Sequence, residues 1–142
     1  DIDKVANTGV HGADDDLLAG LSDVALPLGA AFQLRDDVLG VFGDPDVTGK
    51  PAGDDLREGK RTVLIARAHE LTDDTGRRVL AEALGTDDGV DAVRSLIVDS
   101  GALAAVESDI VILEQQADAA IDAIGAHDVL APLALRTTRR DR

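Results

Sequence analysis

Apolar residues recur every three or four positions along most of the chain, which is the spacing of amphipathic helices. The first such series is Leu17, Leu21, Val24, Leu28 and Phe32. Three acids at 14–16 precede it, where a helix N-terminus favours negative charge. The pattern predicts one long helix over about 14–42. Pro27 lies inside it and lacks a backbone donor, so we expect a kink there.

The same periodicity predicts five further helices, over about 62–71, 75–84, 88–99, 102–124 and 128–140. Residues 1–12 are weakly patterned and are interpreted as a loop or frayed end. Residues 43–59 are rich in glycine, proline and acids, and a loop of this length is usually functional or disordered. No stretch shows the alternation of a strand. The predicted class is all-α, with residues 1–142 forming one portion of a single domain.

The composition restricts how such a core can be built. The 142 residues include two Phe and no Trp, Tyr, Met or Cys, so Leu, Val, Ile and Ala must fill the interior. Without cysteine there is neither a disulfide nor a thiolate metal site, which fits a reducing cytoplasm. The absence of Met indicates a processed product or a fragment.

The charge narrows the choice of partners. Twenty-eight acids and fourteen bases give a net charge of −14. Such a surface repels nucleic acid and anionic membranes and attracts divalent cations. No apolar run approaches the roughly 20 residues that span a bilayer, so no membrane span is expected.

The most informative polar residues lie near the end of the long predicted helix. Gln33, Asp36 and Asp37 fall on one face, with Gly29 and Gly40 one turn to either side. Adjacent carboxylates on an open surface suit Mg²⁺, which takes one or two carboxylates, water and substrate phosphate oxygens. An isolated Asp-Asp pair is more often an ordinary solvated patch, so the neighbouring loop decides the interpretation.

That loop supplies two lysines next to glycines, Lys50 and Lys60. A lysine beside glycine can approach a phosphate closely and acts on it as a point charge. Carboxylates at a helix end followed by two such lysines indicate a site for a metal and a diphosphate.

The stretch from Leu28 to Thr62, LGAAFQLRDDVLGVFGDPDVTGKPAGDDLREGKRT, resembles the second aspartate-rich region of the trans-isoprenyl (polyprenyl) diphosphate synthases. The shared pattern is FQxxDDxxD, followed by GD, GK, G-x-DL and GKxT, and bacterial geranylgeranyl diphosphate synthases resemble it most. The resemblance implies the C-terminal part of the isoprenoid synthase helical bundle. It also implies a Mg²⁺-dependent prenyltransferase that ionises an allylic diphosphate for attack by isopentenyl diphosphate.

The resemblance also implies roles for individual residues. Asp36 ligates Mg²⁺, Asp37 acts beside it directly or through water, and Asp55 orders metal-bound waters. A second set holds the allylic substrate: Lys50 and Lys60 bind its diphosphate, and Gln33 lies near the carbon that ionises. Asp44, in the GD pair, holds the loop.

Two departures from the family pattern matter. Gly40 stands where the third aspartate of the motif is usual, which removes one carboxylate. The first aspartate-rich motif and the basic residues for isopentenyl diphosphate have no match in the chain. We therefore expect the chain to be inactive by itself. The resemblance implies that the full-length protein is a homodimer, and the lack of cysteine fits a cytoplasmic location.

Two alternatives remain open from the sequence. In the first, the chain is an EF-hand-like calcium module, because five loop residues occupy positions 1, 3, 5, 6 and 12 of such a loop: Asp44, Asp46, Thr48, Gly49 and Asp55. In the second, it is a non-catalytic subunit of a heteromeric prenyl synthase. A nucleotide-binding P-loop is set aside, since its spacing fails and Pro51 replaces the metal-binding hydroxyl.

Overall fold

The computed structural model describes residues 3–49 and 51–138. Across those residues it forms helices without any strand, which confirms the predicted all-α class. The helices are α1 Asp3–Phe42, α2 Pro45–Thr48, α3 Asp54–Arg57, α4 Val63–Leu71, α5 Asp74–Ala83, α6 Val90–Asp99, α7 Ala102–Ala123 and α8 His127–Thr138.

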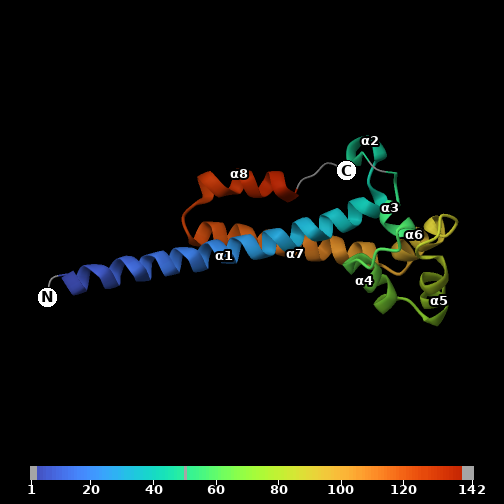
Figure 1. Ribbon diagram of the computed structural model, residues 1–142, viewed down its shortest axis with the longest axis horizontal. Coiled ribbons are helices and arrows are strands. Elements are labelled where there is room, and N and C mark those ends of the chain that lie inside the picture. Colours follow the sequence, from blue (N-terminus) through green and yellow to red (C-terminus); the bar gives the residue numbers. More distant parts are fainter. Residues whose placement is uncertain (1–2, 50, 139–142) are drawn as a thin grey trace.

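Two long helices form the body of the molecule. α7 runs back along α1, and α8 folds back against the C-terminal part of α7 and the middle of α1 (Figure 1). The short helices α2 to α6 gather around the C-terminal end of α1, whereas its N-terminal end projects beyond the other helices (Figure 1). The polar face at residues 33–40 therefore lies in the most densely surrounded part of the fold.

The core joins one side of α1 to α7. α1 contributes Val24, Ala31, Leu34, Val38 and Val41, and α7 contributes Ala102, Val106, Ile110, Ala117 and Ile121. At Gly20 an added Cβ would overlap the side chain of Ile124, the residue that follows α7. The core is built from Leu, Val, Ile and Ala, as the composition predicted, and a glycine at position 20 leaves room for a neighbouring side chain.

The predicted helix limits agree with the structure to within about two residues from Thr62 onward, which is the usual uncertainty of helix ends. Thr62 accepts a hydrogen bond from the backbone N–H of Ile65 (3.3 Å) and so caps α4. The interpretation of 1–12 as a loop is wrong from residue 3 onward, because α1 already begins at Asp3. The loop at 43–59 contains two four-residue helices, α2 and α3. Residues 139 and 140 of the last predicted helix lie outside the described residues.

The expectation that no apolar run could span a bilayer needs correction. Within the described part of the chain, the segment Asp15–Phe42 has the length and composition of a membrane-crossing helix. A single charged residue, Asp23, interrupts residues 17–34. Core helices of soluble proteins meet the same criterion, so this finding is weak evidence for a membrane.

Two isoleucines of α7, Ile110 and Ile112, test the core assignment directly. Ile110 is fully buried and Ile112 is 48% exposed, although they lie on the same helix. We predict that Ile110→Ala lowers the free energy of unfolding by about 2–5 kcal/mol. Ile112→Ala should change it by about 0.5 kcal/mol or less. Urea denaturation of both variants measures the difference, and equal losses would contradict this packing.

Candidate functional site

Asp37 is a buried carboxylate, 3% exposed, at the C-terminal end of α1. Its Oδ1 accepts a hydrogen bond from the Gln33 side-chain amide (3.2 Å), one turn earlier. Its Oδ2 accepts one from the backbone N–H of Val63 (3.2 Å), the first residue of α4. A buried charge needs such partners, and a helix N-terminus has unpaired donors to offer. Asp37 therefore joins α1 to the start of α4.

This burial corrects the expectation of an open acidic surface on α1. Asp36 is only partly buried, and Gln33 is exposed apart from its bond to Asp37. The neighbouring Arg35 lies toward α7, where its guanidinium is 3.7 Å from the carboxylate of Glu114. Of the two adjacent acids, Asp36 is the one nearer to solvent.

Lys60 and Asp55 form an ion pair beside this face, with Lys60 Nζ 3.0 Å from Asp55 Oδ2. Asp55 lies on α3 and is 8% exposed, whereas the Lys60 side chain is about half exposed. The hydrogen bond to Asp55 raises the pKa of Lys60, burial opposes that rise, and the charges of Asp55, Asp37 and Glu58 add to it. Lys60 therefore stays protonated at neutral pH. The stability it contributes is lost only as the pH rises through the raised pKa.

Gly40 lies one turn beyond Asp36 and Asp37 and faces Asp55. A Cβ built on Gly40 would overlap the carboxylate of Asp55. The carboxylate from α3 thus occupies the space next to α1 where a side chain at position 40 would begin. The missing third aspartate of the motif coincides with a carboxylate that arrives from a different helix.

The glycine-rich segment after α1 does not have the form of a calcium loop. Asp44 caps α2, accepting a hydrogen bond from the N–H of Asp46 (2.9 Å), which agrees with its expected role in holding the loop. Gly49 ends α2 with φ +70°, and Asp55 is paired with Lys60. Two of the four expected ligands, Asp44 and Asp55, thus serve other partners, and the EF-hand alternative is not favoured. Lys50, predicted to bind diphosphate, lies outside the described residues.

The acids present suit Mg²⁺ better than a fully protein-ligated cation. No group of three or more acids or histidines converges to hold a metal among the residues that the structure describes. Mg²⁺ needs only one or two carboxylates when substrate phosphates and water complete its shell. Asp36 would provide one such carboxylate, and Asp37, whose oxygens already accept hydrogen bonds, would act beside it. A second pair of adjacent acids, Asp87 and Asp88, is followed by Asp91. These acids differ from Asp36 and Asp37 in their exposure, because the side chains of Asp87 and Asp91 are 88% and 95% exposed.

Sequence reasoning missed one residue that contacts this region, Arg94 on α6. Its Nε and one of its terminal nitrogens donate to the carbonyl of Val41, at 3.2 and 2.9 Å. The available signal was indirect, since α1 has no basic residue in its own last turn. A helix end without such a residue takes a donor from elsewhere.

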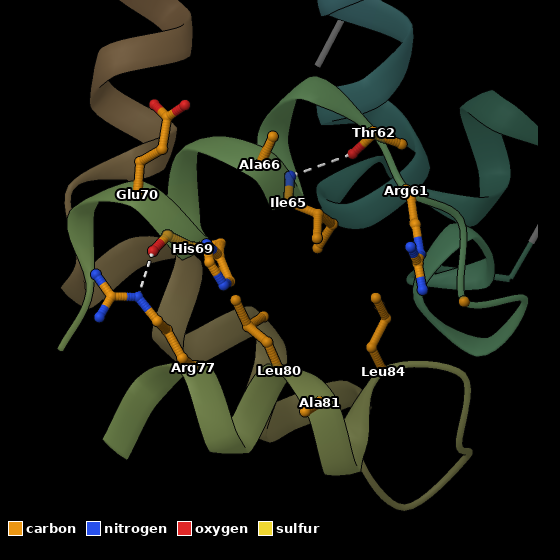
Figure 2. Close-up of a pocket in the computed structure, with 11 residues that line it drawn as sticks. Arg61, Thr62, Ile65, Ala66, His69, Glu70, Arg77, Leu80, Ala81 and Leu84 are labelled. Carbon is orange, nitrogen blue, oxygen red and sulfur yellow. Dashed lines mark hydrogen bonds between the residues drawn. The ribbon is translucent and has the colours of Figure 1, made fainter. Parts of the chain in front are cut away.

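A cavity of about 630 Å³ lies between α4 and α5 (Figure 2). Its walls are mainly apolar, with Ile65, Leu80 and Leu84 around the space and Arg61 on one side (Figure 2). Gly59 and Thr62, on either side of Lys60 and Arg61 in the sequence, also line it. Asp36, Asp37 and Asp55 do not line this cavity, so it is separate from the acidic residues of the candidate site.

Residues 5–99 match the polyprenyl synthetase family, and the chain belongs to that family. This confirms the resemblance seen in the sequence. The chain is 44% identical over 100 residues to the geranylfarnesyl diphosphate synthase of Aeropyrum pernix, covering 68% of this chain and 30% of that protein. It is 48% identical over 59 residues to the geranylgeranyl diphosphate synthase of Mycobacterium tuberculosis, covering 42% and 17% respectively.

Solved structures show the same relationship. Geranylgeranyl pyrophosphate synthase from Corynebacterium glutamicum, complexed with isoprenyl diphosphate and magnesium, superimposes with a TM-score of 0.79 and 38% identity. That match covers 88% of this chain and 38% of the other. The geranylgeranyl pyrophosphate synthetase of Pyrococcus horikoshii gives a TM-score of 0.81 at 26% identity, covering 89% and 40%. The chain thus spans well under half of these relatives.

The contact between Gly40 and Asp55 predicts that the same substitution has opposite effects on stability at two glycines of α1. Alanine in place of glycine inside a helix normally stabilises by about 0.5–1 kcal/mol. Gly29, also on α1, has no atom within 4 Å of an added Cβ, so Gly29→Ala should show this gain. Gly40→Ala should instead destabilise by about 1–3 kcal/mol, because the methyl group displaces the Asp55 carboxylate.

Combining Gly40→Ala with Asp55→Ala removes the overlap. In that background we expect Gly40→Ala to become neutral or stabilising when the free energy of unfolding is measured in urea. Equal gains from Gly29→Ala and Gly40→Ala in the unaltered chain would show that Asp55 does not lie against α1.

Proposed function

We propose that this chain supplies the second aspartate-rich half of a cytoplasmic prenyltransferase, which condenses an allylic diphosphate with isopentenyl diphosphate. The observation that carries the proposal is the clustering of Asp37, Asp55 and Lys60, next to Asp36, in a chain of the polyprenyl synthetase family. In this proposal Asp36 and Asp37 face a Mg²⁺ ion, and Asp55 orders its water. Lys50 and Lys60 bind the allylic diphosphate, with Gln33 near its reacting carbon.

In this proposal the residues of the chain have different roles according to how buried they are. Asp36 is accessible enough to ligate a metal, whereas Asp37 uses both oxygens to hold Gln33 and the start of α4. Lys60 stays charged beside Asp55 and is exposed enough to reach a diphosphate. Bound Mg²⁺ would supply positive charge that stabilises the departing diphosphate. No covalent enzyme intermediate is needed.

The exposed apolar side of α1 supports a larger catalytic unit. Leu17, Leu18, Leu21 and Leu26 are 39–72% exposed. An apolar series of this size on one helix is normally covered. In the proposal it packs against the half of the bundle that carries the first aspartate-rich motif, on the same polypeptide or on a partner. The proposed homodimer would then form from complete subunits.

We predict that residues 1–142 alone do not form prenyl product. With half of the metal-binding carboxylates, the chain cannot hold the diphosphate for ionisation. Incubation with Mg²⁺, farnesyl diphosphate and radiolabelled isopentenyl diphosphate tests this. Chain-elongated product from the purified chain would refute it.

A chimera tests the proposed function itself. Residues 15–142 would replace the matching C-terminal part of the Corynebacterium glutamicum geranylgeranyl pyrophosphate synthase, chosen for its 38% identity and TM-score of 0.79. We expect Mg²⁺-dependent incorporation of isopentenyl diphosphate. Asp36→Ala should reduce turnover about a hundredfold or more, because it removes charge stabilisation at the leaving group.

The matched control is Asp118→Ala, an equally conservative change at an exposed acid of α7. It should leave turnover unchanged. A folded chimera that is inactive, or one that is unaffected by Asp36→Ala, would disprove the proposed function.

A further inference from the structure

The C-terminal end of α1 depends on a side chain from α6. α1 ends at Phe42 without a basic residue in its last turn. Val41, the residue before it, is fully buried. Arg94 donates two hydrogen bonds to that carbonyl, and its guanidinium lies 6.0 Å from the centre of the Phe42 ring. A cation at this position also interacts favourably with the negative end of the helix dipole.

The same guanidinium supports the segment that carries Asp55. Gly53 caps the N-terminus of α3 with φ +79°, a conformation that favours glycine. A Cβ at Gly53 would lie 2.9 Å from a terminal nitrogen of Arg94 and 2.8 Å from Val90. Arg94 therefore fills the space beneath the turn that begins α3. Asp55 follows two residues later, and its carboxylate lies against Gly40 of α1.

The Arg94 side chain thus contacts both segments that carry the acidic residues, at the C-terminal end of α1 and at the start of α3. α1 carries Asp36 and Asp37, and α3 carries Asp55, which holds Lys60. Arginine suits this position because its planar, always charged group can donate to a carbonyl while it packs against an aromatic ring. Lysine, with a compact ammonium on a flexible stem, cannot make all of these contacts together.

We infer that Arg94 is a positioning residue: it fixes the position of the Asp55–Lys60 pair relative to Asp36 and Asp37. The effect of Arg94 on catalysis rests on the proposed function, since this relative position matters for a metal and a diphosphate held between α1 and the loop. Arg94 itself has no contact with the carboxylates of Asp36, Asp37 or Asp55 among the interactions described here. Its effect on them therefore passes through the backbone of Val41 and Gly53.

Hydrogen exchange in the 142-residue chain tests the structural part without any need for activity. The backbone N–H of Leu56 bonds to the Gly53 carbonyl and that of Lys60 to the Asp55 carbonyl, both at 3.0 Å. We expect Arg94→Lys and Arg94→Ala to speed exchange of these two amides at least about tenfold relative to the Ile110 amide in the core of α7. Arg94→Lys keeps the test valid if Arg94→Ala does not fold.

Arg67→Ala is the matched control, because Arg67 pairs with Glu70 and Asp109 and contacts neither α1 nor α3 through these bonds. It should leave the relative exchange of Leu56 and Lys60 unchanged. Unaltered exchange in both Arg94 variants would overturn the inference. Equal acceleration by Arg67→Ala would overturn it as well.

The chimeric synthase tests the catalytic part. We expect Arg94→Lys to raise the Mg²⁺ concentration for half-maximal rate about tenfold or more, as changes outside the ligand set of a metal site commonly do. The rate at saturating Mg²⁺ should fall less. A faster exchange with an unchanged Mg²⁺ requirement would overturn the positioning role. An inactive chimera that retains Arg94 would refute the proposed function instead. The exchange rates of the Leu56 and Lys60 amides would still test whether Arg94 orders the segment around α3.

Discussion

The buried carboxylate of Asp37 is the constraint on which the arrangement of the polar residues depends. A charge with 3% exposure persists only if its oxygens are hydrogen-bonded, and here the donors are the Gln33 amide and the Val63 N–H. Val63 begins α4, 26 residues further along the chain. This bond therefore closes the whole segment between α1 and α4 into a loop whose two ends meet at one carboxylate. Lys60, three residues before Val63, is brought beside Asp55 and Asp37 as a result.

Asp36 and Asp37 are neighbours in the sequence, yet the fold gives them different environments. Successive residues of a helix point about a quarter of a turn apart, so one of the pair faces the start of α4 while the other stays nearer to solvent. In the proposed function, this acidic pair combines a structural anchor, Asp37, with an accessible ligand, Asp36. The anchor limits how far the accessible carboxylate can move, which favours a metal site that is organised before substrate arrives. The proposed function uses this division directly.

The sequence predicted those features that depend on local spacing. Helical periodicity located α4 to α7, and the family pattern identified Asp36, Asp37, Asp55 and Lys60 as candidates. It did not predict that Asp37 would be buried or that Arg94 would reach Val41, 53 residues away, because neither follows from local periodicity. The helical form of residues 3–12 was missed for a different reason, since glycines and weak patterning there favour no structure locally. Long-range partners decide the environments of Asp37 and Arg94, and local patterns in a single sequence do not reveal them.

The glycine at position 40 shows why a motif is better judged in three dimensions than along the chain. Read linearly, DDVLG lacks the third carboxylate of the family pattern and should bind cations less well. In the fold, the carboxylate of Asp55 occupies the space beside Gly40, and a side chain there would displace it. The family pattern already counts Asp55 in its G-x-DL element, so Gly40 leaves α1 with one carboxylate fewer and gives the Asp55 carboxylate room against this helix. The position of Asp55 then depends on the packing of α3 against α1 and α6.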